Sequence, residues 1–70
     1  MDIEKCLYFH KKIKVYIKER NLGKIKSISA LSPWREGLRF HVKCTLQREY
    51  IIYFKGDEIC NIGIYRKELV

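Results

Sequence analysis

The sequence contains three cysteines and two histidines, the side chains that most often bind zinc. Cys6 and His10 are four residues apart, which on a helix places them on one face, and Cys44 and Cys60 are expected to point toward the same interior. A Cys₃His zinc site is therefore conceivable. The clustered spacing usual for zinc ligands is missing, however, and cysteine is often buried without any metal. We predict reduced thiols packed in a core, with no metal and no cofactor.

Residue pairs suited to catalysis are not apparent. His41 stands between Arg39 and Lys43, cations that discourage its protonation, and the pattern places no carboxylate beside it to orient the ring. Asp57 and Glu58 adjoin an expected tight turn, where acidic residues are common for conformational reasons. We therefore predict no enzymatic activity and no small-molecule substrate.

Positive charge is concentrated in one short segment. The formal net charge is +7, and residues 10–26 contribute +6 of it, with Glu19 as their single acidic residue. Such a cluster attracts phosphates or an acidic protein surface, although a charged helix face that only aids solubility is the simpler alternative. The basic residues of the segment are Lys11, Lys12, Lys14, Lys18, Arg20, Lys24 and Lys26.

The basic residues belong to a predicted helix from about Ile3 to Arg20, a stretch without glycine or proline. Successive 100° rotations gather one apolar arc, expected to face the core: Ile3, Cys6, Leu7, Phe9, Ile13, Tyr16 and Ile17. The opposite arc carries Glu4, Tyr8, Lys11, Lys12, Val15, Lys18 and Glu19. Gly23 can adopt the left-handed conformation that ends a helix.

Beyond the helix the apolar period changes to two, which is typical of strands. We predict four, over about Lys24–Leu31, Leu38–Gln47, Glu49–Lys55 and Glu58–Arg66, the first being the weakest. The chain is thus predicted to be a single domain over residues 1–70, of class α+β, with one N-terminal amphipathic helix packed on a four-stranded antiparallel meander sheet.

Two hairpins determine which residues share a face. Gly56 suits the first central position of a type II′ turn, and a two-residue loop at Gln47 and Arg48 would pair Val42 with Tyr53. The face toward the helix would then hold Leu38, Phe40, Val42, Cys44, Leu46, Ile51, Tyr53, Cys60, Ile62 and Ile64. A one-residue slip in the Gln47 hairpin would exchange Ile51 and Tyr53 for Tyr50, Ile52 and Phe54.

The other face of the sheet needs a cover, because the strand Glu49–Lys55 is apolar on both sides and only one helix is available. Cations and aromatic rings together suit single-stranded nucleic acid, whose bases stack on aromatic side chains. A homodimer or another protein is the alternative cover, since large apolar patches rarely stay exposed. The residues expected to contact a partner on this face are Arg39, His41, Lys43, Tyr50, Phe54 and Tyr65.

Two further groups of residues are candidates for partner binding. The helix offers Tyr8, Lys11, Lys12 and Lys18, which could follow a phosphate backbone without reading its sequence. Trp34 lies in a polar loop, where it either closes the open end of the core or, with Arg35, serves as an exposed interface anchor.

These features predict a non-enzymatic small binding protein of inhibitor or adaptor type that engages nucleic acid or a nucleic-acid-handling protein. The alternative is a structural module for homodimerisation or other protein contact, without nucleic-acid affinity. The N-terminus lacks the character of a secretory signal, and no apolar run approaches the roughly 20 residues of a membrane-spanning helix. We therefore expect no membrane partner and a cytoplasmic location.

Overall fold

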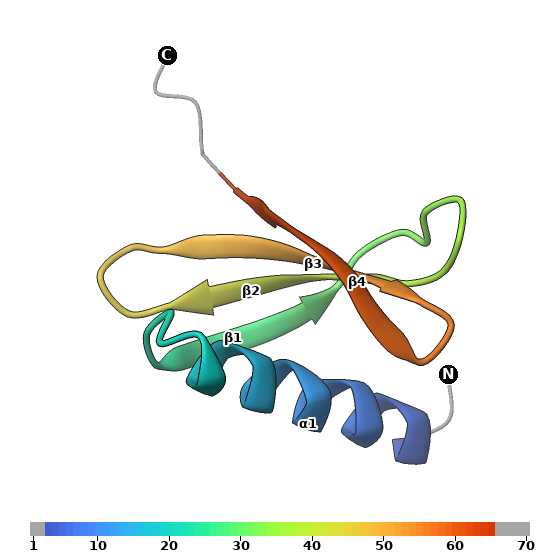
Figure 1. Cartoon of the computed structure of the whole chain (residues 1–70), viewed down its shortest axis with the longest axis horizontal. Helices are drawn as coiled ribbons and strands as arrows, with labels where there is room; N and C mark the ends of the chain where they lie inside the picture. The colour runs from blue at the N-terminus through green and yellow to red at the C-terminus, as the bar shows by residue number, and fades with distance from the viewer. Residues whose placement is uncertain (1–2, 66–70) are drawn as a thin grey trace.

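A computed structural model describes residues 3–65 of the chain. Helix α1 (Ile3–Glu19) precedes strands β1 (Ile25–Ala30), β2 (Arg39–Cys44), β3 (Glu49–Lys55) and β4 (Glu58–Ile64). The strands form one antiparallel sheet in the order β1-β2-β3-β4, and α1 runs alongside β1 (Figure 1). The α+β class, the N-terminal helix and the meander predicted from the sequence are confirmed.

Helix α1 buries a narrower stripe than the apolar pattern predicts. Phe9, Ile13 and Ile17 recur every four residues and are at most 5% exposed. Ile3 and Leu7, expected on the core arc, are 76% and 64% exposed. Leu7 is rotated by about 120° from Ile13 around the helix axis, so it points away from the sheet that covers the stripe.

The helix ends in a Schellman motif centred on Asn21 rather than on Gly23. Asn21 has a φ of 55°, its N–H donates to the carbonyl of Lys18, and the N–H of Leu22 donates to the carbonyl of Ile17. These two bonds satisfy carbonyls that the helix leaves without a partner. Gly23, with a φ of 112°, then turns the chain toward β1.

The register of the β2–β3 hairpin is shifted by three residues from the predicted one, not by one, and this odd shift gives β3 the alternative faces considered for it and corrects the first assignment. Its turn centres on Leu46 and Gln47, with φ values of 62° and 58°, as a type I′ turn requires. Val42 therefore pairs with Tyr50 and not with Tyr53. Leu46, expected to face the helix, is 77% exposed at the turn.

The β3–β4 hairpin turns at Gly56 as predicted, but its register then shifts. Lys55 pairs with Glu58 and Phe54 with Ile59, after which a bulge at Cys60 makes Tyr53 pair with Asn61. Gly56 has a φ of 62°, the left-handed value needed at the first central position. Because a bulge adds one residue to a strand, Cys60 is exposed instead of facing the core.

The core lies between α1 and one face of the sheet. In the described chain, all side chains that are classed as buried are hydrophobic. Phe9 and Phe54 pack edge to face at its centre, with ring centroids 4.7 Å apart. Tyr50 and Phe54, which the sequence placed on the partner-binding face, are 8% and 0% exposed and belong to this core, because the hairpin register reverses their direction.

Candidate functional site

A hollow at the C-terminal end of α1 has only positive charges among its lining residues. Lys14 and Lys18 approach it from the helix and Lys24 from the segment that leads into β1. Its volume is about 760 Å³, and no carboxylate lines it. We call this surface the lysine hollow; its other lining residues are Ile17, Asn21, Gly23, Ile25, Thr45 and Leu46.

The floor of the lysine hollow is held by backbone contacts between the start of β1 and the β2–β3 hairpin. The N–H of Lys24 donates to Thr45 Oγ1 (3.2 Å), and the N–H of Thr45 donates to the carbonyl of Lys24 (2.8 Å). This reciprocal pair fixes the position of the Lys24 backbone relative to the sheet. The Lys24 side chain therefore starts from a fixed point beside the two helix lysines.

The helix extends the lysine hollow into a row of cations. Lys11, Lys14 and Lys18 are spaced by three and four residues, which aligns them on one side of a helix. At 1.5 Å per residue the row covers about 10 Å along the axis. All three side chains are exposed. Lys11 and Lys18 are among the binding residues predicted from the sequence; Lys14 is not among them, although the same helical spacing places it in this row.

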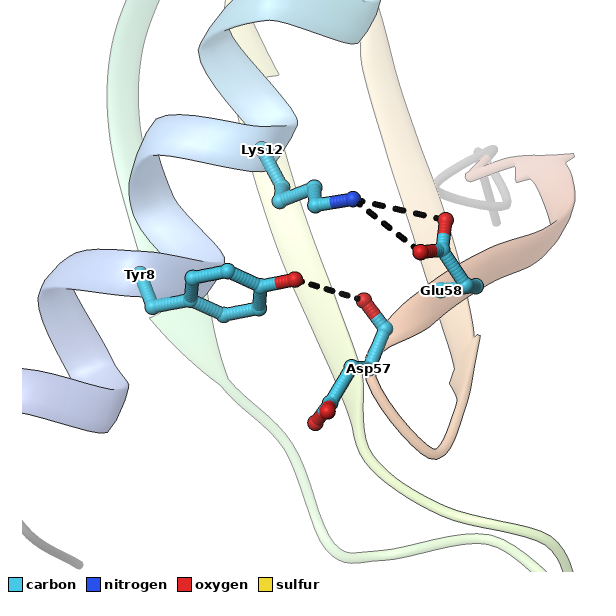
Figure 2. Close-up of polar contacts among 4 residues, drawn as sticks. All are labelled: Tyr8, Lys12, Asp57 and Glu58. Carbon is cyan, nitrogen blue, oxygen red and sulfur yellow. Dashed lines mark hydrogen bonds and ion pairs between the residues drawn. The ribbon is translucent and has the colours of Figure 1, made fainter.

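A second concavity, which we call the α1–β4 groove, lies between the helix and the β3–β4 hairpin. Its volume is about 570 Å³. Figure 2 shows Lys12 donating to both carboxylate oxygens of Glu58 (3.3 Å each) and the hydroxyl of Tyr8 donating to the carbonyl of Asp57 (3.4 Å). The hydrogen bond to Glu58 raises the pKa of Lys12 above its usual value of 10.5.

Charges in the α1–β4 groove balance, unlike those in the lysine hollow. Lys11 and Lys12 are matched there by Glu19 and Glu58, and the remaining lining residues are Tyr8, Val15, Tyr16 and Ile59. Lys12, which was predicted to bind a partner molecule, forms an ion pair with Glu58 within the chain. The lining of the groove is thus mixed and partly apolar, with no formal net charge, and Lys11 is shared between this groove and the row of lysines along α1.

The outer face of the sheet is partly covered by the β1–β2 connection. Trp34 packs its ring edge to face against Tyr53, with centroids 5.3 Å apart, and its Nε1 donates to the carbonyls of Leu38 and Phe54 (3.1 and 3.0 Å). Nearby, Arg39 Nε donates to the carbonyl of Ser32 (2.7 Å). Trp34 therefore packs on the outer face of the sheet and is not part of the core between helix and sheet.

The centre of the outer face is a local cluster around His41. Its Nε2 lies 2.8 Å from Glu49 Oε1, and its ring lies 4.5 Å from that of Tyr65. The prediction that no carboxylate lies beside His41 is wrong, because the observed register of β2 and β3 brings Glu49 diagonally opposite it. Ser29 pairs with His41 across β1 and β2, yet the described contacts include no hydrogen bond from its hydroxyl to the imidazole.

The candidate binding residues fall into four separate groups. Lys11 and Lys18 belong to the row of lysines along α1, of which Lys18 lines the lysine hollow, whereas Tyr8 and Lys12 are engaged by the β3–β4 hairpin. The outer face of the sheet and its covering loop hold Trp34, Arg35, Arg39, His41, Lys43 and Tyr65, and the core holds Tyr50 and Phe54.

The four metal-ligand candidates are not gathered in one place. Cys6 Sγ lies 3.7 Å from His10 Nε2, Cys44 is buried and Cys60 is exposed on the edge strand β4. Burial raises the pKa of the Cys44 thiol above its usual value of 9.0. Within residues 3–65 no group of three or more potential metal ligands occurs.

Comparison with known proteins adds no family: the chain matches no protein-family model, no curated protein and no solved structure. In the described part of the chain, no helix is long and apolar enough to cross a membrane.

Proposed function

We propose that this chain is a non-enzymatic binding protein that holds the phosphate backbone of nucleic acid in the lysine hollow, without reading base sequence. The observation that carries the proposal is the convergence of Lys14, Lys18 and Lys24 on one concave surface without a carboxylate. Lysine ammonium groups contact phosphates as point charges and release the counterions condensed on the polymer. Binding of this kind is driven by charge and weakens steeply with salt.

The position of the lysine hollow supports a polymer over a single small anion. Lys11 continues the row for about 10 Å along the helix from Lys18, a length that can follow consecutive phosphates. The C-terminal dipole of α1 opposes a bound anion by only ~0.3 to 1 kcal/mol at low ionic strength. Several exposed lysines outweigh such a term, and the exposed Leu46 beside them offers an apolar contact to a sugar or base.

The sheet face is the weaker candidate for nucleic acid. Two of its expected aromatic residues, Tyr50 and Phe54, are in the core, and Trp34 covers the face of the sheet at Tyr53. His41 is bound to Glu49. A stacking platform needs open aromatic rings, so this face is poorly suited to base stacking.

The proposal is tested by titrating fluorescent single-stranded and duplex oligonucleotides of unrelated sequence at several salt concentrations. Lys14→Gln combined with Lys18→Gln should weaken binding of every sequence. The slope of log K against log salt should fall by about 1.4 on single strands and about 1.8 on duplex, since each lost phosphate contact removes roughly 0.7 or 0.9.

A matched control removes the same charge elsewhere. Lys43→Gln with Lys55→Gln lowers the net charge equally, but Lys43 lies on the outer face and Lys55 pairs with Glu36 at the β3–β4 turn. This variant should keep the parental salt slope. Equal losses of oligonucleotide affinity in both double variants would show that only net charge matters and would refute the lysine hollow as the site. A parent protein without measurable affinity for either oligonucleotide would refute the proposal as a whole.

A further inference from the structure

Strand β4 forms an edge of the sheet that carries no charge over most of its length. It is the last strand in the order β1-β2-β3-β4, and residues 59–64 include neither a charged residue nor a proline. Edge strands usually carry lysine or proline, which prevent pairing with another chain. Among the described residues, β4 is protected by its bulge at Cys60 and by the Asn61 side chain, which accepts a hydrogen bond from the N–H of Ile62 and would have to release it on pairing, so the stretch from Gly63 onward is left open.

Hydrogen-bond alternation shows which backbone groups of β4 are open. The N–H of Tyr65 donates to the carbonyl of Glu49, so this antiparallel pair is hydrogen-bonded and the pair Tyr50 and Ile64 is not. The N–H and C=O groups of Ile62 and Ile64 therefore point away from β3. Consistent with this direction, the N–H of Ile62 donates to the side chain of its neighbour Asn61 (2.9 Å).

The residues along this edge are suited to pairing with themselves. If β4 of a second copy lies antiparallel with Gly63 opposite Gly63, each Ile62 faces the other copy's Ile64, and both pairs are of the hydrogen-bonded kind. Side chains of Ile62 and Ile64 then pack across the two-fold axis on the helix side of the sheet. Ile64 is 69% exposed in the single chain, and in this arrangement Ile62 of the second copy would cover part of it.

Gly63 has no explanation within the single chain. Its φ is not positive, and an added Cβ would meet only Tyr53 Cε1, at an ordinary 3.8 Å. Glycine inside a strand weakens it and often marks a place where another backbone approaches closely. A second β4 strand centred on Gly63 supplies such a neighbour.

Charge favours a second copy over a polyanion at this edge. The α1–β4 groove beside β4 has two lysines and two glutamates, whereas the unbalanced lysines surround the lysine hollow. Two copies that meet along β4 therefore bring together locally neutral surfaces. A nucleic acid gains no phosphate contact from the uncharged residues of β4 themselves.

We propose that two copies of the chain associate through antiparallel pairing of their β4 strands about Gly63, forming one continuous sheet of two meanders. The paired stretch is short, so the interface is smaller than that of an obligate dimer, and the dimer should be weak and concentration-dependent. This arrangement differs from a dimer closed through the outer sheet face, because it uses backbone hydrogen bonds at the edge.

Sedimentation equilibrium over a wide concentration range tests the proposal. The mass should rise toward twice the 8.5 kDa of one chain. Ile64→Lys should raise the dissociation constant by about tenfold or more, because the change places a charge in each cross-strand pair. Ile64→Pro should act similarly, since proline removes the outward N–H while leaving the bonds to β3 intact. Leu7→Lys, at a similarly exposed position on α1 outside both concavities, is the matched control and should dissociate like the parent.

Hydrogen exchange gives a readout that the fold of the single chain does not supply. The Ile64 amide should exchange quickly in dilute protein and slowly at concentrations where the dimer prevails, while the Gly63 amide is protected in both. A constant mass of one chain up to millimolar concentration overturns the proposal and leaves the edge to a different partner. A dimer that resists both Ile64 substitutions overturns it too, by assigning the interface to another surface.

Discussion

Adjacent isoleucines in β3 provide the sharpest test of the sheet register. Ile52 is 0% exposed and faces α1, whereas Ile51 lies on the outer face and is only half-buried. Ile52→Ala should lower the free energy of unfolding by ~2 to 5 kcal/mol, from lost burial and the cavity left behind. Ile51→Ala should cost clearly less, roughly 1 kcal/mol, because much of its side chain still contacts water. Both substitutions remove the same side chain from neighbouring positions of one strand, so the difference between them reports on the face that each residue occupies.

Urea unfolding followed by circular dichroism measures both values. A 70-residue domain has a total stability of roughly 3.5 to 10 kcal/mol, so Ile52→Ala removes a large part of it. Should that variant be unfolded in water, Ile52→Val and Ile51→Val keep the comparison measurable, with ~0.5 to 1.5 kcal/mol expected for the buried site. Equal losses in the free energy of unfolding, or a larger loss at Ile51, would mean that Ile51 and Tyr53 face the helix and that the described register is incorrect.

Three other substitutions or treatments probe separate parts of the fold. Leu46→Asn with Gln47→Gly should raise the free energy of unfolding by ~1 to 2 kcal/mol in the same urea assay, because both positions are left-handed and Leu46 is exposed; a loss would argue against the type I′ turn. Gly37→Ala should displace the loop that carries Trp34, since the new Cβ would collide with the Phe54 carbonyl, and a red shift in tryptophan fluorescence should report it. Cys60 is exposed and should react with a thiol reagent well before the buried Cys44; equal labelling rates would contradict the assigned burial. Because burial raises the folded-state pKa of Cys44 above 9.0, the free energy of unfolding should fall as the pH rises above that value.

The elements of the fold follow from the sequence because their signals are local. A helix with apolar residues every three or four positions and strands with alternating residues each show their period within a short window. Gly56 identified one hairpin for the same reason, since its turn needs a left-handed residue at that position.

The faces of β3 could not be obtained in this way. A type I′ turn usually has asparagine and glycine at its centre, and here Leu46 and Gln47 adopt the left-handed conformation instead. Every residue of β3 between Tyr50 and Phe54 is apolar, so the alternation that would reveal its inner face is missing. The bulge at Cys60 shows no signal either, because neither glycine nor proline marks it.

Only part of the candidate site could be predicted from the sequence, because only the helix lysines have a local signal. The excess of lysine in residues 10–26 is visible in composition, and helical spacing predicts which lysines share a side. The convergence of Lys24 with Lys14 and Lys18 depends on the chain reversal after Gly23 and on the hydrogen bonds between Lys24 and Thr45. Contacts between residues so far apart in sequence are produced only by the folded chain.

The lysines of the hollow contribute little to the fold that positions them. Buried side chains in the described chain are all hydrophobic, and Lys14 and Lys18 are exposed. As like charges four residues apart they destabilise the helix by ~0.2 to 0.5 kcal/mol, whereas the helix dipole favours Lys18 in the last turn by ~0.3 to 1 kcal/mol, so the two terms largely offset. Their removal should therefore change the free energy of unfolding by less than about 1 kcal/mol while it weakens phosphate binding. Because stability is expected to change little, an unfolding curve of the Lys14→Gln and Lys18→Gln variant separates a loss of affinity from a loss of fold. This separation makes the lysine hollow a surface whose role can be measured without disturbing the core beneath it.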